Sequence, residues 1–250
     1  MKKLVLVASI LASTTVAASA ADMAPRYYSK APPPMIAPIY NWGGFYVGVN
    51  GGWGSSHNCW SNTAVLGVAF PALGEGCHDS TGGTVGGQVG YRWQAGNWVF
   101  GLEAQGNWAD FSGSNRSLVF ANLTNRTRID AFGLFTGQVG YAWNNALLYV
   151  KGGAAVTDNR YDGLLTGTGL VIDHASDTRW GGAVGAGVEY GFAPNWSAAL
   201  EYDHIFTANQ NQAFRTPAGA AFGFDNTRQD VDLVTVRLNY RWGGPVIAKY

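Results

Sequence analysis

The sequence predicts an all-β protein, an eight-stranded antiparallel up-and-down transmembrane β-barrel. Charged residues make up only 13% of the chain, and 35 of its 250 residues are glycine. Soluble domains carry about 25% charged residues, yet this chain has no run of about 18 apolar residues that could form a membrane helix after its N-terminus. A recurring segment of about fifty residues and a period-two alternation of apolar and polar side chains complete the evidence. Low charge without membrane helices is typical of a barrel, whose backbone groups bond between strands.

Residues 1–20 are predicted to be a signal peptide. Lys2 and Lys3 precede an apolar run over residues 4–12, and Ala18-Ser19-Ala20 supplies the small residues that signal peptidase requires. The run is too short to span a bilayer. Residues 21–41, which include Pro32-Pro33-Pro34, are expected to form an extended periplasmic tail. The chain is therefore expected to be exported.

An internal repeat predicts where the β-hairpins lie. The segments 87–93 and 137–143 share the pattern Gly-Gln-Val-Gly-Tyr-x-Trp, and Tyr91, Tyr141, Tyr190 and Tyr240 follow one another at intervals of 50, 49 and 50 residues. Each of the first three tyrosines is followed by a very short turn, and a new strand begins directly afterwards. Self-similarity at a fixed period indicates one supersecondary unit per repeat, here a β-hairpin.

Eight strands follow from this repeat. They are predicted at 45–54, 82–93, 98–109, 129–143, 147–157, 178–192, 196–206 and 231–242. Long polar loops are expected at 55–81, 110–128, 158–177 and 207–230, and short turns at 94–97, 144–146 and 193–195. Short turns at one end and long loops at the other are typical of outer-membrane barrels. The barrel is assigned to 42–243 and a C-terminal tail to 244–250, and all nine prolines fall outside the predicted strands.

The alternation also predicts which face meets lipid. In the third strand Trp98, Phe100 and Leu102 share one face, and Glu103 shares the other with Gln105. A water-soluble barrel with an apolar interior is the alternative. Aromatic residues at the strand ends favour lipid outside, because membrane interfaces select indole rings. The predicted girdle beside the short turns comprises Trp42, Phe45, Trp93, Trp98, Trp143, Phe192, Trp196 and Trp242. A sparser belt at the other rim comprises Trp53, Trp108, Trp180 and Phe206.

One polar residue from each strand is expected to reach the lumen at a similar height. These residues are Asn50, Gln88, Glu103, Gln138, Lys151, Glu189, Glu201 and Arg237. Unpaired charges would be costly there, so the three glutamates are expected to pair with Lys151 and Arg237. Because eight strands leave an interior filled by side chains, we interpret the set as a static polar plug. A gated pore controlled by these pairs is the alternative.

Cys59 and Cys77 are predicted to form a disulfide, since an exported chain meets an oxidising compartment. A soft-metal site that adds His57 and His78 is a second interpretation, and two free thiols are a third. The irregular spacing of the flanking residues disfavours the metal. No metal and no cofactor are therefore predicted.

Both ends of the predicted barrel carry familiar segments. Residues 41–52 read Asn-Trp-Gly-Gly-Phe-Tyr-Val-Gly-Val-Asn-Gly-Gly, and residues 236–243 read Val-Arg-Leu-Asn-Tyr-Arg-Trp-Gly. They resemble the small outer-membrane β-barrels of alphaproteobacteria, a family of surface antigens and hemin-binding, porin-like proteins related to the membrane domain of outer-membrane protein A. The resemblance implies a Gram-negative outer membrane and recognition by the barrel-assembly machinery. An aromatic last strand with Leu238, Tyr240 and Trp242, or the terminal Tyr250, would be the signal that this machinery reads.

These features predict a structural outer-membrane protein that contributes to envelope integrity and presents surface loops, with its lumen closed by a polar network. A narrow porin-like channel and a surface adhesin or ligand-binding barrel, for example for hemin, are the alternatives; no motif here places hemin. We expect a monomer in contact with outer-membrane lipid and lipopolysaccharide. Arginines near the outer rim could contact lipopolysaccharide phosphates; they are Arg116, Arg126, Arg128, Arg160 and Arg179. A net charge of zero without a basic block argues against nucleic acid.

The chain is not expected to be an enzyme. Acyl chemistry needs a serine, a base and an orienting acid held within hydrogen-bond reach. His57, His78 and His174 lie in predicted loops, where a nearby serine is no evidence of a held geometry. His204 is better anchored and adjoins Asp203, but no serine is close to it in sequence.

Overall fold

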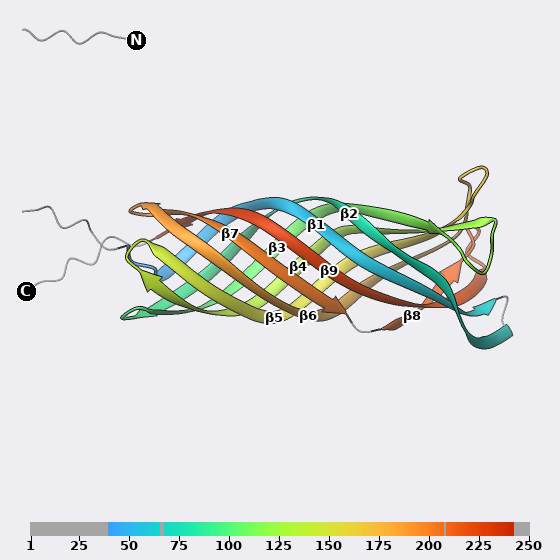
Figure 1. The fold of residues 1–250 in the computed structure, drawn as a ribbon, viewed down its shortest axis with the longest axis horizontal. Helices are drawn as coiled ribbons and strands as arrows, with labels where there is room; N and C mark the ends of the chain where they lie inside the picture. The colour runs from blue at the N-terminus through green and yellow to red at the C-terminus, as the bar shows by residue number, and fades with distance from the viewer. Residues whose placement is uncertain (1–39, 66–67, 208, 243–250) are drawn as a thin grey trace, which may run out of the picture. The chain divides into compact units, whose positions relative to one another are not determined.

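A computed structural model describes residues 40–65, 68–207 and 209–242. The signal peptide at 1–20, the C-terminal tail at 244–250 and all but the last two residues of the predicted tail 21–41 lie outside them. The described residues form one antiparallel sheet, whose strands are β1 (Gly44–Val65), β2 (Val68–Ala95), β3 (Trp98–Arg116), β4 (Leu123–Trp143), β5 (Ala146–Leu165), β6 (Val171–Ala193), β7 (Trp196–Thr207), β8 (Gln210–Arg215) and β9 (Ala221–Arg241). The pairing of β1 with β9 closes the sheet into a barrel (Figure 1).

The described residues form nine strands, but these occupy only eight positions around the barrel. β7 and β8 both lie between β6 and β9, so they are two parts of the seventh position. The predicted antiparallel barrel class is confirmed. Among the described residues there is no helix of the length and apolar character needed to cross a membrane.

The tight turns fall where the repeat predicts them. β2 and β3 are joined through Gly96 and Asn97, and β4 and β5 through Asn144 and Asn145. Gly96 has φ of 61° and Asn144 has φ of 51°. Two-residue hairpins require this left-handed conformation, which glycine and asparagine adopt more readily than other residues. The glycine and asparagine residues of these turns therefore determine where the strands end on this side of the barrel.

The long loops at the other end were predicted wrongly. The strands run on through most of 55–81, 110–128, 158–177 and 207–230, and the connections that remain are short, such as 117–122 and 166–170. Polar composition suggested loops, but antiparallel pairing satisfies the backbone whatever side chains the strand carries. Pro71 also lies within β2, beside a shift in its pairing with β1. An irregular position of this kind can accommodate a residue without a backbone N–H.

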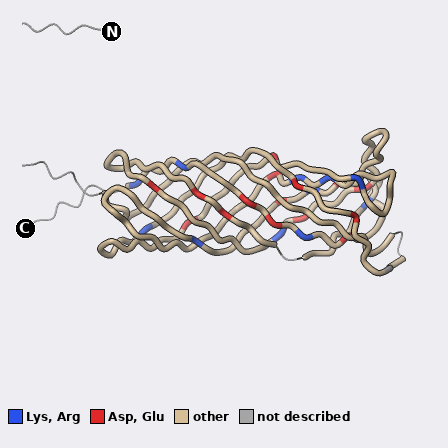
Figure 2. The backbone as a smooth tube through the Cα atoms, viewed as in Figure 1, with Lys and Arg blue, Asp and Glu red and all other residues tan. Residues whose placement is uncertain are grey.

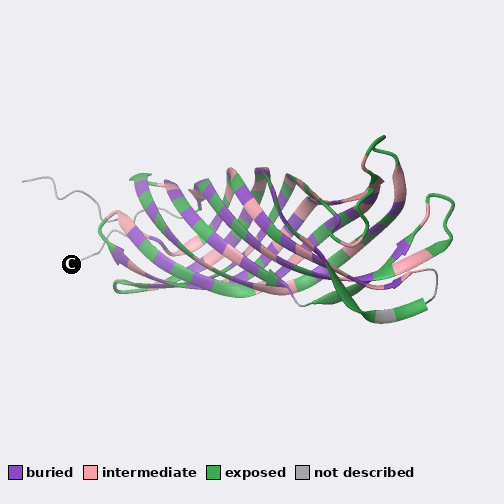
Figure 3. Cartoon of the chain, turned by 45° about the vertical axis from the view of Figure 1, so that its right-hand side comes forward, coloured by how far each residue is buried: buried purple, intermediate pink, exposed green. Residues whose placement is uncertain are grey.

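Buried and exposed residues alternate along each strand (Figure 3). Phe100 and Leu102 are exposed, whereas Glu103 and Arg237 are buried. Figure 2 shows how few charged residues the strands carry. The apolar side chains therefore cover the outer wall, as the alternation predicts, and a water-soluble carrier with an apolar interior is excluded.

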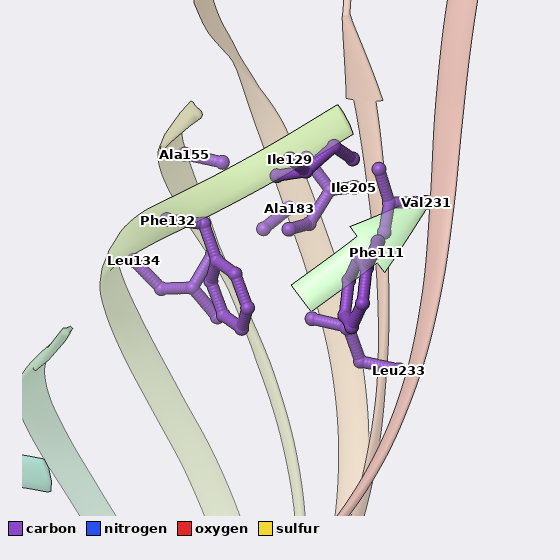
Figure 4. Close-up of a cluster of buried hydrophobic side chains, with 9 residues drawn as sticks. All are labelled: Phe111, Ile129, Phe132, Leu134, Ala155, Ala183, Ile205, Val231 and Leu233. Atoms are coloured by element: carbon purple, nitrogen blue, oxygen red, sulfur yellow. The ribbon is translucent and has the colours of Figure 1, made fainter. Parts of the chain in front are cut away.

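An apolar layer fills the lumen midway along the barrel, which the sequence interpretation missed. Its side chains point toward one another from six strands (Figure 4); they are Phe111, Ile129, Phe132, Leu134, Ala155, Ala183, Ile205, Val231 and Leu233. We call this cluster the apolar plug. Gly54 makes room for it, because a Cβ there would lie 2.4 Å from Phe111 Cζ. The interior thus alternates between polar and apolar layers.

Candidate functional site

All eight residues predicted to form the lumen network are buried, each with at most 6% of its surface exposed. They face the lumen from successive strands, because every second side chain along a strand points to the same face of the sheet. Other buried polar residues join them into one connected set. We call this set the lumen network.

The charged centre of the lumen network lies around Arg237. Its guanidinium contacts the carboxylates of Glu103 and Glu201 at the same time. Lys151 Nζ lies 2.7 Å from Glu201 Oε1 and 3.6 Å from Glu103 Oε1. Lys151 also lies 3.2 Å from Asp203 Oδ1, a residue that the sequence interpretation left out of the network. Two cations thus face three carboxylates, and this geometry satisfies most of the buried charge.

Glu189 pairs elsewhere than predicted. Its Oε2 accepts a hydrogen bond from Arg92 Nη2 at 2.8 Å, and neither Lys151 nor Arg237 contacts it. Arg92 was missed, although it follows Gln88 by four residues and so shares the lumen face of β2. Its guanidinium carbon also lies 4.4 Å from the ring centroid of Tyr46, a cation–π contact that helps to offset desolvation.

Neutral side chains connect the ionic groups. Gln138 Nε2 donates to Tyr46 Oη at 3.0 Å, and the Tyr46 hydroxyl donates to Glu103. On the other side of the lumen, Asn239 Nδ2 donates to Glu189 Oε1 at 2.9 Å. A run of amides then continues across the lumen through Gln88 Nε2 to Asn239 Oδ1, Asn50 Nδ2 to Gln88 Oε1, and Asn107 Nδ2 to Asn50 Oδ1.

Seven of the eight predicted girdle residues are exposed on the outer wall, namely Phe45, Trp93, Trp98, Trp143, Phe192, Trp196 and Trp242. Trp42 is the exception, and its assignment was wrong, since only 1% of its surface is exposed. It precedes β1 and packs against Tyr40, with ring centroids 4.5 Å apart. Both belong to a buried apolar cluster with Val99 and Leu147. Because Trp42 lies before the first paired residue, strand parity does not determine its direction.

The four residues of the predicted outer belt are exposed too, and Trp108 reaches 74%. Because the strands continue well past them, the outer part of the barrel stands beyond this belt. Arg179 was expected among the rim arginines, but it is buried and its Nη2 donates to the Thr227 carbonyl at 2.9 Å. Its place in the alternation of side chains along β6 directs it into the lumen.

Cys59 and Cys77 are joined by a disulfide. Both lie in the segment 55–81 that was predicted to be a loop, but they face each other in the β1–β2 pairing beyond the outer belt. Ligand atoms of His57, Cys59 and Cys77 lie within 4.8 Å of one another. With both sulfurs bonded, no thiolate is available for a metal. His78, the fourth residue of the metal interpretation, instead faces the lumen and contacts Asn115 and Thr127.

His204 has a carboxylate partner, but not the one that adjoins it in sequence. His204 Nδ1 lies 2.8 Å from Asp232 Oδ1, which also accepts a hydrogen bond from Tyr202 at 2.6 Å. Asp203 points into the lumen toward Lys151 instead. A base and an acid are therefore adjacent on the outer wall, and no serine hydroxyl belongs to this group of described contacts.

The model of the outer membrane protein beta-barrel domain family matches residues 8–241. The chain belongs to this family of outer-membrane barrels. It is 29% identical to a 31 kDa outer-membrane immunogenic protein of Brucella melitensis, over 96% of this chain and 100% of the relative. It is 30% identical to a 22 kDa outer membrane protein of Rhizobium leguminosarum bv. viciae, over 76% of this chain and 75% of the relative.

Among solved structures, the outer membrane protein OprG from Pseudomonas aeruginosa is similar with a TM-score of 0.45 and 11% identity, over 80% of this chain and 97% of OprG. The family match and the two sequence relatives place this member of the family in the outer membrane. They also confirm the resemblance to alphaproteobacterial surface antigens.

Proposed function

We propose that this outer-membrane barrel is a structural protein that strengthens the envelope and presents its outer rim to the medium, with a lumen that stays closed. The lumen network carries the proposal. A chain of buried ion pairs and amides runs from Asn107 to Lys151 across a narrow interior. The apolar plug adds a second barrier beyond it. An eight-stranded barrel has an interior that side chains can fill.

The proposal of a closed lumen is tested by measuring ion conductance through planar bilayers that contain the refolded full chain. We expect no steady ion current from the wild-type protein. Because the apolar plug blocks the lumen independently, Glu103→Ala should leave the current absent as well. Heat-modifiable migration on gels serves as the folding control for each variant. A steady wild-type current that changes in Glu103→Ala would overturn the closed lumen and favour the porin-like alternative.

Surface presentation is supported by the exposed tips of the outer rim, such as Leu118 between β3 and β4. The Brucella relative is described as immunogenic. A Leu118→Cys variant on intact cells should react with a membrane-impermeant maleimide, whereas a cysteine in the turn at Asn144 should not. Envelope integrity is tested by deleting the gene and measuring detergent sensitivity. Restoration by the wild-type gene supports this role, and an unchanged sensitivity of the deletion strain contradicts it.

A further inference from the structure

A small cavity lies inside the outer end of the barrel, beyond the aromatic belt. Its volume is about 20 Å³, which is room for one particle of the size of a water molecule. Its wall includes Glu75 of β2, Asp173 of β6 and Asp225 of β9, together with Asn62 of β1. Among the described residues that line it there is no lysine, arginine or histidine. Three acidic groups from separate strands thus surround one small space.

These carboxylates are buried without a cationic partner. Glu75, Asp173 and Asp225 expose only 3%, 6% and 7% of their surface. No ion pair joins any of them to a lysine, arginine or histidine within the described part of the chain. Deeper in the lumen every buried carboxylate has a basic partner; these carboxylates are Glu103, Glu189, Glu201 and Asp203. The outer group therefore lacks the charge compensation that the lumen network has.

Unsatisfied oxygen atoms also line this cavity. Asn62 Oδ1 and Asp225 Oδ1 are buried and have no hydrogen-bond donor among the described residues. Asn62 is 94% buried, since 6% of its surface is exposed, and it faces Asp225 across the β1–β9 pairing. By contrast, Glu75 Oε2 accepts a hydrogen bond from Asn125 Nδ2 at 2.7 Å, which holds that carboxylate in place. A bound water or a bound cation can satisfy buried oxygens that have no donor in the protein.

We propose that this cavity binds a divalent cation of the Ca²⁺ class. All the available ligand atoms are oxygens, from carboxylates and from the Asn62 amide, and hard cations prefer such ligands. The three carboxylates do not all come within 4.8 Å of one another, so at most two of them ligate the ion directly and the coordination is irregular. Ca²⁺ accepts such mixed and irregular shells, whereas Mg²⁺ requires a near-ideal octahedron. The bound cation links the strands that carry its ligands at the outer rim.

Gly163 supports the position of one ligand. It pairs with Asp173 across β5 and β6, and a Cβ at Gly163 would lie 2.0 Å from Asp173 Oδ1. The carboxylate therefore occupies the space that a side chain would fill. Gly163→Ala should displace Asp173 and weaken cation binding while leaving every ligand residue in the chain.

The test is calorimetric titration of CaCl₂ into the full chain, refolded in micelles free of lipopolysaccharide and treated with chelator. We expect one saturable site in the wild-type protein and affinity weaker by about tenfold or more in Asp225→Asn. Asp79→Asn is the matched control, because Asp79 lies on the outer wall of the same strand as Glu75 and is exposed. It should bind as the wild type does.

A second readout uses Tb³⁺, whose luminescence is excited through a nearby indole. Trp60 lines the cavity, so Trp60→Phe should remove most of the signal while CaCl₂ still competes in the wild type. Gel migration checks folding, and Asp173→Asn replaces Asp225→Asn if the latter does not fold. The absence of saturable Ca²⁺ binding would overturn the proposal. Equal binding by the wild type, Asp225→Asn and Asp173→Asn would overturn it as well.

Discussion

Lys151 Nζ lies 2.7 Å from Glu201 Oε1, and both side chains are almost completely buried. The same ammonium group faces Glu103 and Asp203, so Lys151→Met would leave three carboxylates with Arg237 as the main cation. Removing one partner of a buried pair costs about 3–5 kcal/mol. We expect a loss of this size in the free energy of unfolding, measured by urea titration of the barrel in micelles.

The control for this prediction is an exposed ion pair on the outer wall. Arg160 Nε lies 2.8 Å from Asp130 Oδ2, and the Arg160 side chain is 61% exposed. Exposed pairs contribute less than about 1 kcal/mol, so Arg160→Met should change the urea midpoint only slightly. Equal losses in the two variants would contradict a specific role for the buried cluster.

The apolar plug should respond to changes of volume in both directions. Phe111→Ala removes a fully buried ring and should cost about 3–5 kcal/mol in unfolding free energy. Gly54→Ala inserts a methyl group against the Phe111 ring and should cost about 1–3 kcal/mol. Combining Gly54→Ala with Phe111→Leu should recover part of that loss, because the two sites share one space. Simple additivity of the two costs would show that they do not contact each other.

Loss of the disulfide should loosen only the outer end of the barrel. Cys59 and Cys77 lie 18 positions apart in the sequence, and closing a loop of that size contributes about 3 kcal/mol in the chain-entropy model. In the double variant Cys59→Ser and Cys77→Ser, amide hydrogen exchange should accelerate in 56–80. Exchange near the Gly96 turn should stay unchanged. Wild-type protein treated with reductant should behave as the variant does, and uniform acceleration would count against a local effect.

The carboxylates of the outer cavity predict that the stability of the outer strands depends on pH when a chelator is present. Burial, followed by the neighbouring carboxylates of Glu75 and Asp173, raises the pKa of Asp225 to about 8 from its ordinary value of 3.8. Burial also raises the pKa of Asp173 to about 6. The folded state then binds protons that an unfolded chain releases, so the stabilisation is full below pH 4 and is lost as pH rises toward 8.

Hydrogen exchange in the outer strands, corrected for intrinsic rates, measures this dependence. Protection near Asn62 and Asp225 should fall between pH 5 and pH 8 in the wild-type protein. Asp225→Asn should flatten the curve above about pH 6, because its amide does not titrate and the pKa of the remaining Asp173 is about 6. A wild-type protection that rises with pH would refute the sign of the effect.

The strand order and the facing of side chains could be predicted because they depend on local periodicity. The tyrosines of the repeat mark the turn end of the strands, and Tyr141 packs against Trp98 across a hairpin with ring centroids 5.4 Å apart. The alternation of side chains along each strand then placed Glu103, Lys151 and Arg237 in the lumen. Such inferences need only the spacing of residues along one strand.

What could not be predicted depends on contacts across the lumen. The partner of Glu189 is Arg92, four strand positions away in the barrel order, and no local pattern relates the two. The apolar plug was missed for a related reason, since Phe111, Ile205 and Leu233 come from strands whose stagger is set by the closure of the whole sheet. The polar outer segments read as loops because polarity does not distinguish a solvated strand from a connection.

The continuation of the strands beyond the outer belt determines what an antibody can contact. Most residues of 68–82 pair with β1, and buried residues such as Glu75 and His78 point away from the medium. A linear peptide from this stretch would display both faces of the strand, whereas the native rim displays one. Immunisation with unstructured peptides from the outer rim should therefore elicit sera that recognise the denatured antigen better than the living cell.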